Sequence, residues 1–420
     1  MKKLMKKLCC KVIIGIIVLL FAIPVFAEEN RLFGGLWNKG YIQSVFDKVY
    51  IGGYMSHEVE IDDVRSGGYS TFDLHYYSLQ VFTRITNGIS VGSALNFEHG
   101  GLFAGTKKSG NVNLEFAVAE IKLISDVWKL KGGIILVPFG KYNILHDSPL
   151  RDLQDPPLMM STLVPVIWSD AGFGFTGEIK TLQDSGLIYD LCFINGLADN
   201  FDVGSNGTTV KVVKDEYGNE IKVIDTVKKD GSHLINDENG LRNARYSWEH
   251  DINNDKSFVG RIGYLPISNF ELGVSGYYGK YDITDHAVLM MLGFDITYEL
   301  GQLELLGEIA TAKLGSSVLL DSNGNEVGVP PAMNGFYVQV NYHFLYNSFR
   351  DGDKFTGTIQ YSKIDNDTSR ETINDKHRIS LGLNYRPVED FRIGIEYQLN
   401  GNVTSSVYDR TIFVSLATYF

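Results

Sequence analysis

One proline-rich segment, residues 139–169, concentrates charged side chains that can contact a solute. They are Lys141, His146, Asp147, Arg151, Asp152 and Asp155. A mixed set of bases and acids attracts, repels and hydrogen-bonds small ions, which is the chemistry of a filter rather than of bond making. The segment is also stiff, because it contains Pro149, Pro156, Pro157 and Pro165, and each proline fixes φ and removes a donor. We therefore interpret 139–169 as a constriction that meets solutes.

The other motifs do not indicate catalysis, a cofactor or a metal. GFGFTG at 172–177 matches G-x-G-x-x-G, but it lies inside a strand-like segment and does not open a helix. Residues 321–332 begin like a calcium loop, yet Glu326 replaces the required glycine and Ala332 the required glutamate, so a hairpin tip is favoured. Catalysis would need a Ser/His or Asp/His constellation, and the histidines show none at a convincing spacing; they include His75, His99, His146, His286 and His343. We predict no enzyme.

The surrounding sequence alternates between apolar and polar residues in segments of about ten, as transmembrane strands do. In 334–345, for example, Val338 and Val340 alternate with Gln339 and Asn341. Such strands turn apolar residues to lipid and polar residues to a wet interior. We expect an all-β fold, a transmembrane antiparallel β-barrel of about 16 strands, at 48–57, 71–85, 88–98, 112–124, 127–138, 170–179, 185–195, 256–265, 269–281, 289–299, 302–313, 334–345, 353–363, 376–386, 390–400 and 408–420.

The connections between these strands alternate in length. Every second one is tight, as at 125–126 and 301–302, and the long ones include 139–169 and 196–255. This rhythm predicts one rim of short periplasmic turns and one rim of longer extracellular loops. The third loop contains LMMSTLVPVIW, which is too apolar to extend into water, so we expect it to fold into the barrel with its apolar half on the wall and its charged half facing the pore. The alternative is a loop over the rim or against a neighbouring subunit.

Both ends of the chain carry targeting features. Residues 1–27 have five lysines and then an apolar run, which predicts a cleaved signal peptide rather than a retained anchor. Residues 28–46 would form a short periplasmic segment, and 47–420 the barrel. Removal of the five lysines leaves 33 of 38 basic residues against 50 acidic ones, a net charge of about −17, which argues against nucleic-acid binding. The terminal Tyr419 and Phe420 resemble the signal read by barrel-assembly machinery.

The segment GGIILVPFGKYNILHDSPLRDLQDPPLM, with VPVIWSDAGFGFTGE after it, resembles the phosphate-selective porin O and P family, as does VGRIGYLPISNFELGVSGYYGKYD at 259–282. The resemblance extends over most of the chain after residue 27. It implies a sixteen-stranded, trimeric, passive channel that is narrowed by its third loop and conducts anions through pore-lining arginines and lysines.

The charged residues that the alternation of each strand places in the lumen include both bases and acids. The predicted pore-lining residues are Arg84, Lys129, Lys131, Arg261, Glu304, Glu308, Arg378, Arg392 and Glu396, with Arg386, Glu98, Asp190, Glu271 and Asp295 on the same face. A selective oxyanion filter needs donors of one sign gathered together. The residues therefore favour a general channel for ions and small hydrophilic solutes over one dedicated to phosphate.

We accordingly expect an outer-membrane porin of a Gram-negative bacterium. Its expected partners are outer-membrane lipid, lipopolysaccharide beneath the exposed 196–255 loop, the assembly machinery, two further copies in a homotrimer, and the permeating ions. Two alternatives stay open: a structural barrel that sheathes or anchors a surface or electron-transfer protein, and a barrel enzyme.

Overall fold

The computed structural model describes most of the chain after residue 42. It covers residues 43–420 apart from 47–48, 63–67, 69, 101–109, 182–184, 200, 203–209, 215–219, 225–231, 246–252, 283–285, 316–317 and 321–325. The predicted signal peptide and most of the predicted periplasmic segment therefore lie outside the described residues.

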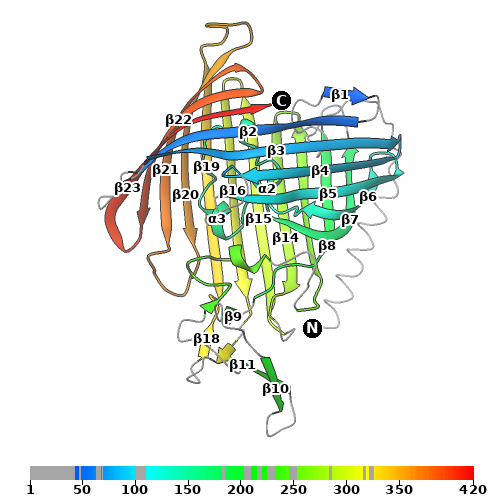
Figure 1. Ribbon diagram of the computed structural model, residues 1–420, viewed down its shortest axis with the longest axis vertical. Helices are drawn as coiled ribbons and strands as arrows, with labels where there is room; N and C mark the ends of the chain where they lie inside the picture. The colour runs from blue at the N-terminus through cyan, green and yellow to red at the C-terminus, as the bar shows by residue number, and fades with distance from the viewer. Residues whose placement is uncertain are drawn as a thin grey trace.

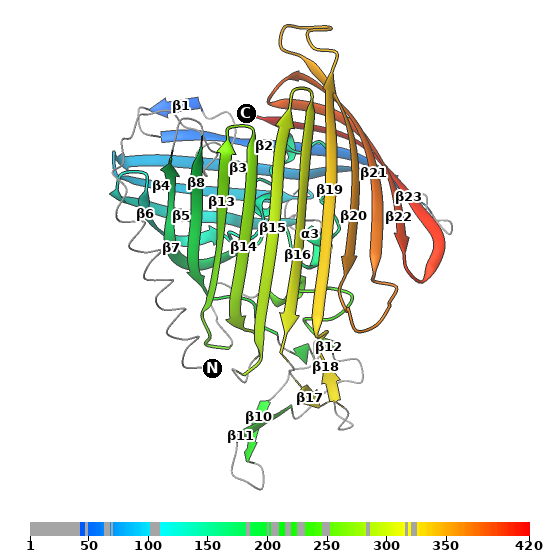
Figure 2. The ribbon, with the colours of Figure 1, turned by 180° about the vertical axis from the view of Figure 1, so that it is seen from behind.

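Sixteen antiparallel strands form one closed barrel (Figures 1 and 2). They are β2 (Val49–Asp62), β3 (Ser70–Thr86), β4 (Ile89–Glu98), β5 (Asn111–Ile124), β6 (Trp128–Leu136), β7 (Ser169–Lys180), β8 (Gly186–Ile194), β13 (Ser257–Ile267), β14 (Phe270–Lys280), β15 (Val288–Leu300), β16 (Leu303–Leu314), β19 (Ala332–Phe344), β20 (Lys354–Asp365), β21 (Lys376–Val388), β22 (Phe391–Asn402) and β23 (Ser405–Tyr419). Each strand pairs with its neighbour in this order, and β23 pairs with β2 to close the wall. The predicted fold and all sixteen predicted strands are confirmed.

Short strands outside the sixteen lie at the two rims of the barrel. Strand β1 (Gln43–Phe46) pairs with the start of β2. The pairs β9 (Phe201–Asp202) with β12 (Ser232–His233), β10 (Val210–Lys214) with β11 (Glu220–Ile224), and β17 (Val318–Leu320) with β18 (Glu326–Gly328) lie on the rim opposite to the C-terminus (Figure 1). Among the described residues no helix is both long and apolar enough to cross a bilayer.

The alternation along each strand separates an apolar outside from a polar inside. On β19, Val338 and Val340 are 48% and 39% exposed, whereas Gln339 between them and Asn341 after them are 9% and 1% exposed. Phe173 and Phe175 of β7 also face outward, as expected. Period-two alternation therefore places apolar side chains where a bilayer would cover them and polar side chains in the interior.

The connections between strands alternate between short and long as expected, with two exceptions. Residues 345–353 form a nine-residue connection on the short-turn rim, and residues 403–404 form a two-residue connection on the loop rim. The strict alternation expected from sequence is therefore wrong at these places. The longer turn is held together by the Asp353 carboxylate, which accepts backbone N–H groups of Ser348, Phe349 and Arg350.

The C-terminal residues complete the barrel seam. Phe420 and Gly53 exchange two backbone hydrogen bonds of 3.0 and 3.2 Å. The Phe420 ring stacks on Tyr77 at a centroid distance of 5.3 Å, and Tyr419 meets Tyr54 edge-on at 6.1 Å. The two aromatic residues Tyr419 and Phe420 are therefore part of the contact that closes the barrel.

Gly133 of β6 is a point where the strand tolerates no side chain. Its φ is +132°, and a Cβ would lie 2.0 Å from the Ala117 carbonyl oxygen of β5. We expect Gly133→Ala to destabilise the barrel by about 2 kcal/mol or more, because both the backbone and the neighbouring strand must shift. The measurement is the temperature at which the folded, fast-migrating band of the barrel is lost in gel electrophoresis.

Gly132 provides the matched control, because a Cβ there would meet its nearest atom at an ordinary 3.7 Å. Gly132→Ala should leave the unfolding temperature nearly unchanged. Equal unfolding temperatures for the two variants would contradict the steric explanation.

Candidate functional site

The third long connection, residues 137–168, folds into the barrel, and we refer to it as the inner loop. It contains three short helical turns, α2 (Lys141–Ile144), η2 (Ser148–Leu150) and α3 (Met159–Thr162). Figures 1 and 2 show α2 and α3 within the wall of strands. The inward fold predicted for this loop is confirmed.

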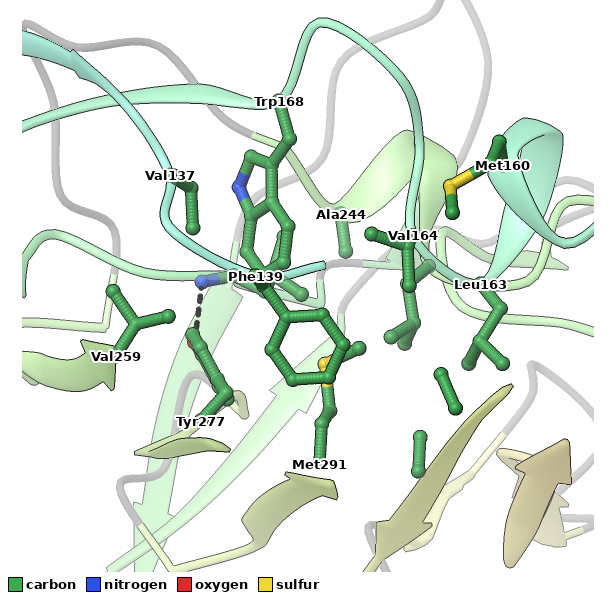
Figure 3. Close-up of a cluster of buried hydrophobic side chains, with 14 of the residues drawn as sticks. Val137, Phe139, Met160, Leu163, Val164, Trp168, Ala244, Val259, Tyr277 and Met291 are labelled. Atoms are coloured by element: carbon green, nitrogen blue, oxygen red, sulfur yellow. Dashed lines mark hydrogen bonds between the residues drawn. The ribbon is translucent and has the colours of Figure 1, made fainter. Parts of the chain in front are cut away.

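The apolar half of the inner loop packs on the inner wall. Trp168 is 1% exposed, and its ring lies 5.6 Å from that of Tyr277 on β14 and 6.4 Å from Phe139 (Figure 3). Met159, Met160, Leu163 and Val164 are buried in the same cluster, which includes Met291 of β15 (Figure 3). Because each such side chain contributes about 1.5–3 kcal/mol on burial, this half is firmly fixed to the wall.

A buried asparagine ties the two ends of the inner loop together. Asn143 donates through Nδ2 to the carbonyl oxygens of Val137 and Trp168, and its Oδ1 accepts the Trp168 N–H at 2.9 Å. The side chain is fully buried. The loop is therefore closed at its base by one residue that satisfies three backbone groups at once.

The first charged part of the inner loop bonds to β14, β15 and β16. Lys141 contacts Glu271 of β14 at 2.6 Å and the Thr297 hydroxyl of β15 at 2.9 Å. The backbone N–H of Tyr142 donates to Glu308 of β16 at 2.6 Å. These contacts hold α2 against one side of the interior.

The later charged part bonds to β19, β21 and β22. Asp152 accepts from Asn341 at 2.8 Å and from Arg386 at 3.1 Å, and Arg386 also donates to the carbonyl oxygens of Pro149 and Arg151. Asp155 accepts from Arg378 at 3.2 Å. The loop therefore crosses the interior between strands far apart in the barrel order.

Gln154 of the inner loop bonds to four residues on β22 and β2. Its N–H donates to Glu396 of β22 at 2.6 Å, its Oε1 accepts from Arg392 at 3.0 Å, and its Nε2 donates to Ser56 and Glu58 of β2. The sequence prediction missed this residue because it is neutral. Its one signal was a polar side chain among prolines and acids.

The remaining predicted constriction residues are held inside the loop and at the seam. The His146 ring contacts the Asn143 carbonyl oxygen through Nδ1 at 2.8 Å and lies 3.4 Å from Glu115 through Nε2. Asp147 accepts from the Tyr419 hydroxyl at 3.2 Å. Arg151 donates to Ser148 and Tyr142. Burial raises the pKa of Tyr142 although Arg151 opposes this, so the hydroxyl stays protonated.

The expected orientation of the charged half needs correction. His146, Asp147, Arg151 and Asp152 are buried, because they bond to the wall and to the loop itself and do not face open water. Lys141 and Asp155 keep side-chain exposures of 23% and 30%. Of the six predicted residues, these two are thus the ones that a solute inside the barrel can reach most easily.

The predicted pore-lining bases and acids largely pair with one another. Lys131 lies 2.6 Å from Asp190, and Arg261 bonds to both Glu271 and Asp295. Glu304 accepts from Asn341 at 2.7 Å. Arg392 and Glu396 hold Gln154, as described above, whereas Lys129 contacts Asp126 of a short turn, and Arg84 is exposed at the end of β3. The alternation along each strand thus predicts which charged residues point inward, but it does not predict which residues they bond to.

A cavity of about 370 Å³ lies at the loop-rim end of the inner loop. It is bounded by Ser161 and Thr162 of α3 and by residues of β20 to β23, including Arg378 and Asn400. Its lining mixes both signs of charge, with Lys376 and Asp409 also present. The cavity therefore borders the inner loop on its loop-rim side.

Comparisons with known proteins agree with this architecture. No protein-family model matches the chain. An uncharacterized protein of Aquifex aeolicus (strain VF5) is 25% identical over 385 residues, which cover 86% of this chain and 78% of that protein. Among solved structures, the anion-selective porin from Comamonas acidovorans is similar with a TM-score of 0.51 and 10% identity, over 89% of this chain and 99% of that one. OmpF of Salmonella typhi gives 0.52 and 11%, over 89% and 97%.

A third solved structure, the DcaP channel of Acinetobacter baumannii, gives a TM-score of 0.50 at 9% identity, over 91% of this chain and 99% of that one. At these identities the similarity concerns the fold. The chain thus has the porin-like barrel fold of outer-membrane proteins, whereas membership of the phosphate-selective porin O and P family stays a prediction.

Loss of the Arg386 side chain should loosen residues 149–155 of the inner loop and leave the strands on the other side of the barrel unchanged. In Arg386→Ala the Asp152 carboxylate loses one of its two donors and the carbonyl oxygens of Pro149 and Arg151 lose theirs, at a local cost of about 3 kcal/mol. We expect faster hydrogen exchange in residues 149–155 and unchanged exchange in β13 to β16, as measured by mass spectrometry of the refolded barrel. Arg350→Ala, an exposed arginine of the 345–353 turn, is the control. Unchanged protection of 149–155 in Arg386→Ala would contradict the anchoring role.

Proposed function

We propose that this protein is an outer-membrane porin, a channel for passive diffusion of ions and small hydrophilic solutes. The observation that carries the proposal is an inner loop that crosses a polar barrel interior while the outer face is apolar. Sixteen strands enclose more space than side chains alone fill, so a loop inside them narrows an aqueous path. Passage then depends on size and on the charges along the path, without catalysis or a cofactor.

The charges favour a general channel with a weak preference for cations. Lys131, Lys141 and Arg261 each contact a carboxylate at 2.6–2.7 Å, so little of their positive charge is left for a passing anion. The whole chain is acidic, with a formal net charge of −12. Arg151, Arg386 and Arg392 lie near one another, but all three are buried and donate to the inner loop or to Asn384, so they offer no open set of donors to replace the hydration of phosphate. The phosphate preference implied by the family resemblance is therefore the less favoured form of the proposal.

The proposal also includes location and assembly. The short-turn rim with the C-terminus would face the periplasm, and the rim with residues 196–255 would face lipopolysaccharide. Tyr419 and Phe420 would be read by the barrel-assembly machinery, and residues 1–27 by the export machinery. A homotrimer is supported by the family resemblance and by the similar OmpT of Vibrio cholerae, whose structure is described as a trimer form.

Two other functions agree less well with the geometry of the site. A barrel that sheathes or anchors another protein needs an unobstructed lumen, and here the inner loop occupies it. An enzyme needs a reactive constellation, whereas the acids and bases near the constriction bond to one another and to backbone.

The reversal potential under a potassium chloride gradient tests the proposal. In planar bilayers we expect the refolded protein to form channels that are unselective or prefer K⁺, and that phosphate does not block. Strong chloride preference with phosphate block would overturn the general-channel form. Folded protein without any conductance would overturn the porin proposal and favour the sheath or anchor.

Lys141→Gln should shift the reversal potential further toward K⁺, because Glu271 then keeps its negative charge without its lysine partner. The matched control is Lys256→Gln, which removes the same charge from an exposed position just before β13. Equal shifts in the two variants would show that Lys141 does not face the ion path.

A further inference from the structure

A cluster of two histidines and two carboxylates lies at the loop-rim end of β2, β3 and β4. Nδ1 of His99 is 2.6 Å from the Asp73 carboxylate. Nδ1 of His75 is 3.6 Å from the same carboxylate and 3.3 Å from Glu58. One ligand atom from each of Asp73, His75 and His99 lies within 4.8 Å of the other two. None of these residues takes part in the inner loop itself.

A β-bulge in β3 produces this convergence. Ser56 pairs with Tyr76, but Glu58, two residues further on, pairs with Asp73, so β3 carries one extra residue. Below the bulge Ser78 and Gln80 face inward and are buried, whereas above it Phe72 and Leu74 are exposed on the outside. Without the extra residue, Asp73 and His75 would face the apolar outside. The bulge therefore turns two ionisable side chains toward Glu58 in the interior.

The backbone also fixes the second histidine. His99 follows β4 with φ of +49°, an uncommon conformation for this residue, and its N–H donates to the His75 carbonyl oxygen at 3.2 Å. The two rings meet edge-on with centroids 5.4 Å apart. The bulge in β3 and the left-handed backbone of His99 thus bring both histidine rings close to the Asp73 carboxylate.

We propose that Asp73, His75 and His99 bind a divalent transition-metal ion of the Zn²⁺ type at the loop-rim mouth of the barrel, with Glu58 beside His75. Two imidazole nitrogens and one carboxylate oxygen, with solvent at the fourth position, form a common ligand set for such ions. Ligand atoms about 2.1 Å from a tetrahedral ion lie roughly 3.4 Å apart, close to the 3.6 Å between His75 and Asp73. The shorter His99–Asp73 contact opens by rotation of His99, whose side chain is 51% exposed. No motif or spacing in the sequence predicts this site, because the bulge depends on the pairing of β3 with β2.

Glu58 connects the cluster to the constriction, because its carboxylate also accepts Nε2 of Gln154 from the inner loop. This shared carboxylate means that the ion would sit beside the loop and not on the outer surface. It also gives Glu58 a second role, so its substitution is unsuited to testing the metal site alone.

The test is isothermal titration of the metal-stripped, refolded full barrel in detergent with zinc chloride. We expect saturable binding of one Zn²⁺ per chain, and at least about tenfold weaker binding in His99→Ala and in Asp73→Asn, because each removes one ligand. His57→Ala is the matched control. It removes a neighbouring histidine that is exposed on β2 and stacks on the outward-facing Phe72, so its affinity should equal that of the unchanged protein.

The heat-shifted gel band verifies that each variant is folded before titration. Absence of saturable binding by the unchanged protein, or equal affinity in His99→Ala and Asp73→Asn, would overturn the proposal and leave the cluster as a set of ion pairs. Since binding is measured without a conductance readout, its failure and a failure of the channel function are distinguishable.

Discussion

Closure of the strand ring is the constraint on which the rest of this structure depends. In the hydrocarbon of a membrane no water can replace a missing backbone hydrogen bond. An open sheet edge is therefore not tolerated, and β23 must pair with β2. Their pairing from Tyr54–Tyr419 to Asp62–Thr411, extended by the Phe420 contacts, meets that requirement. Once the ring is closed, each residue has a defined inside or outside. The apolar exterior, the polar interior and the positions open to the inner loop all follow from that single condition.

The interior is organised by two different kinds of contact. Trp168, Met159 and their neighbours fix one half of the inner loop by apolar burial, which is not directional. The charged half instead uses directional bonds that reach several strands, because a buried charge is costly without a partner. The outcome is a loop held in one arrangement, with Lys141 and Asp155 still partly exposed. Mutual pairing of bases and acids, as between Lys131 and Asp190, lets these charges be buried in the interior.

The bulge in β3 shows how a small irregularity changes what the barrel presents. A one-residue insertion in the ladder reverses the facing of every residue beyond it. Here the reversal keeps Phe72 and Leu74 on the apolar exterior and brings Asp73 and His75 beside Glu58. A regular strand with Ser78 and Gln80 inside would have placed Phe72 and Leu74 in the interior and Asp73 and His75 on the apolar exterior. The irregularity is thus required by the sequence of β3, and the His/carboxylate cluster is its consequence.

The sequence by itself determined the strands, their number and the inward fold of the third loop. Period-two alternation such as that of Val338, Gln339 and Val340 is local information, and the apolar, proline-rich run of 139–169 is equally local. Only the tertiary structure decided the partners. Arg386 and Asp152 are separated by 234 residues and Lys131 and Asp190 by 59, so parity could place each charge inside but not say which opposite charge neutralises it. The β3 bulge also depended on the register between neighbouring strands, which is set by the closed ring and not by any one segment.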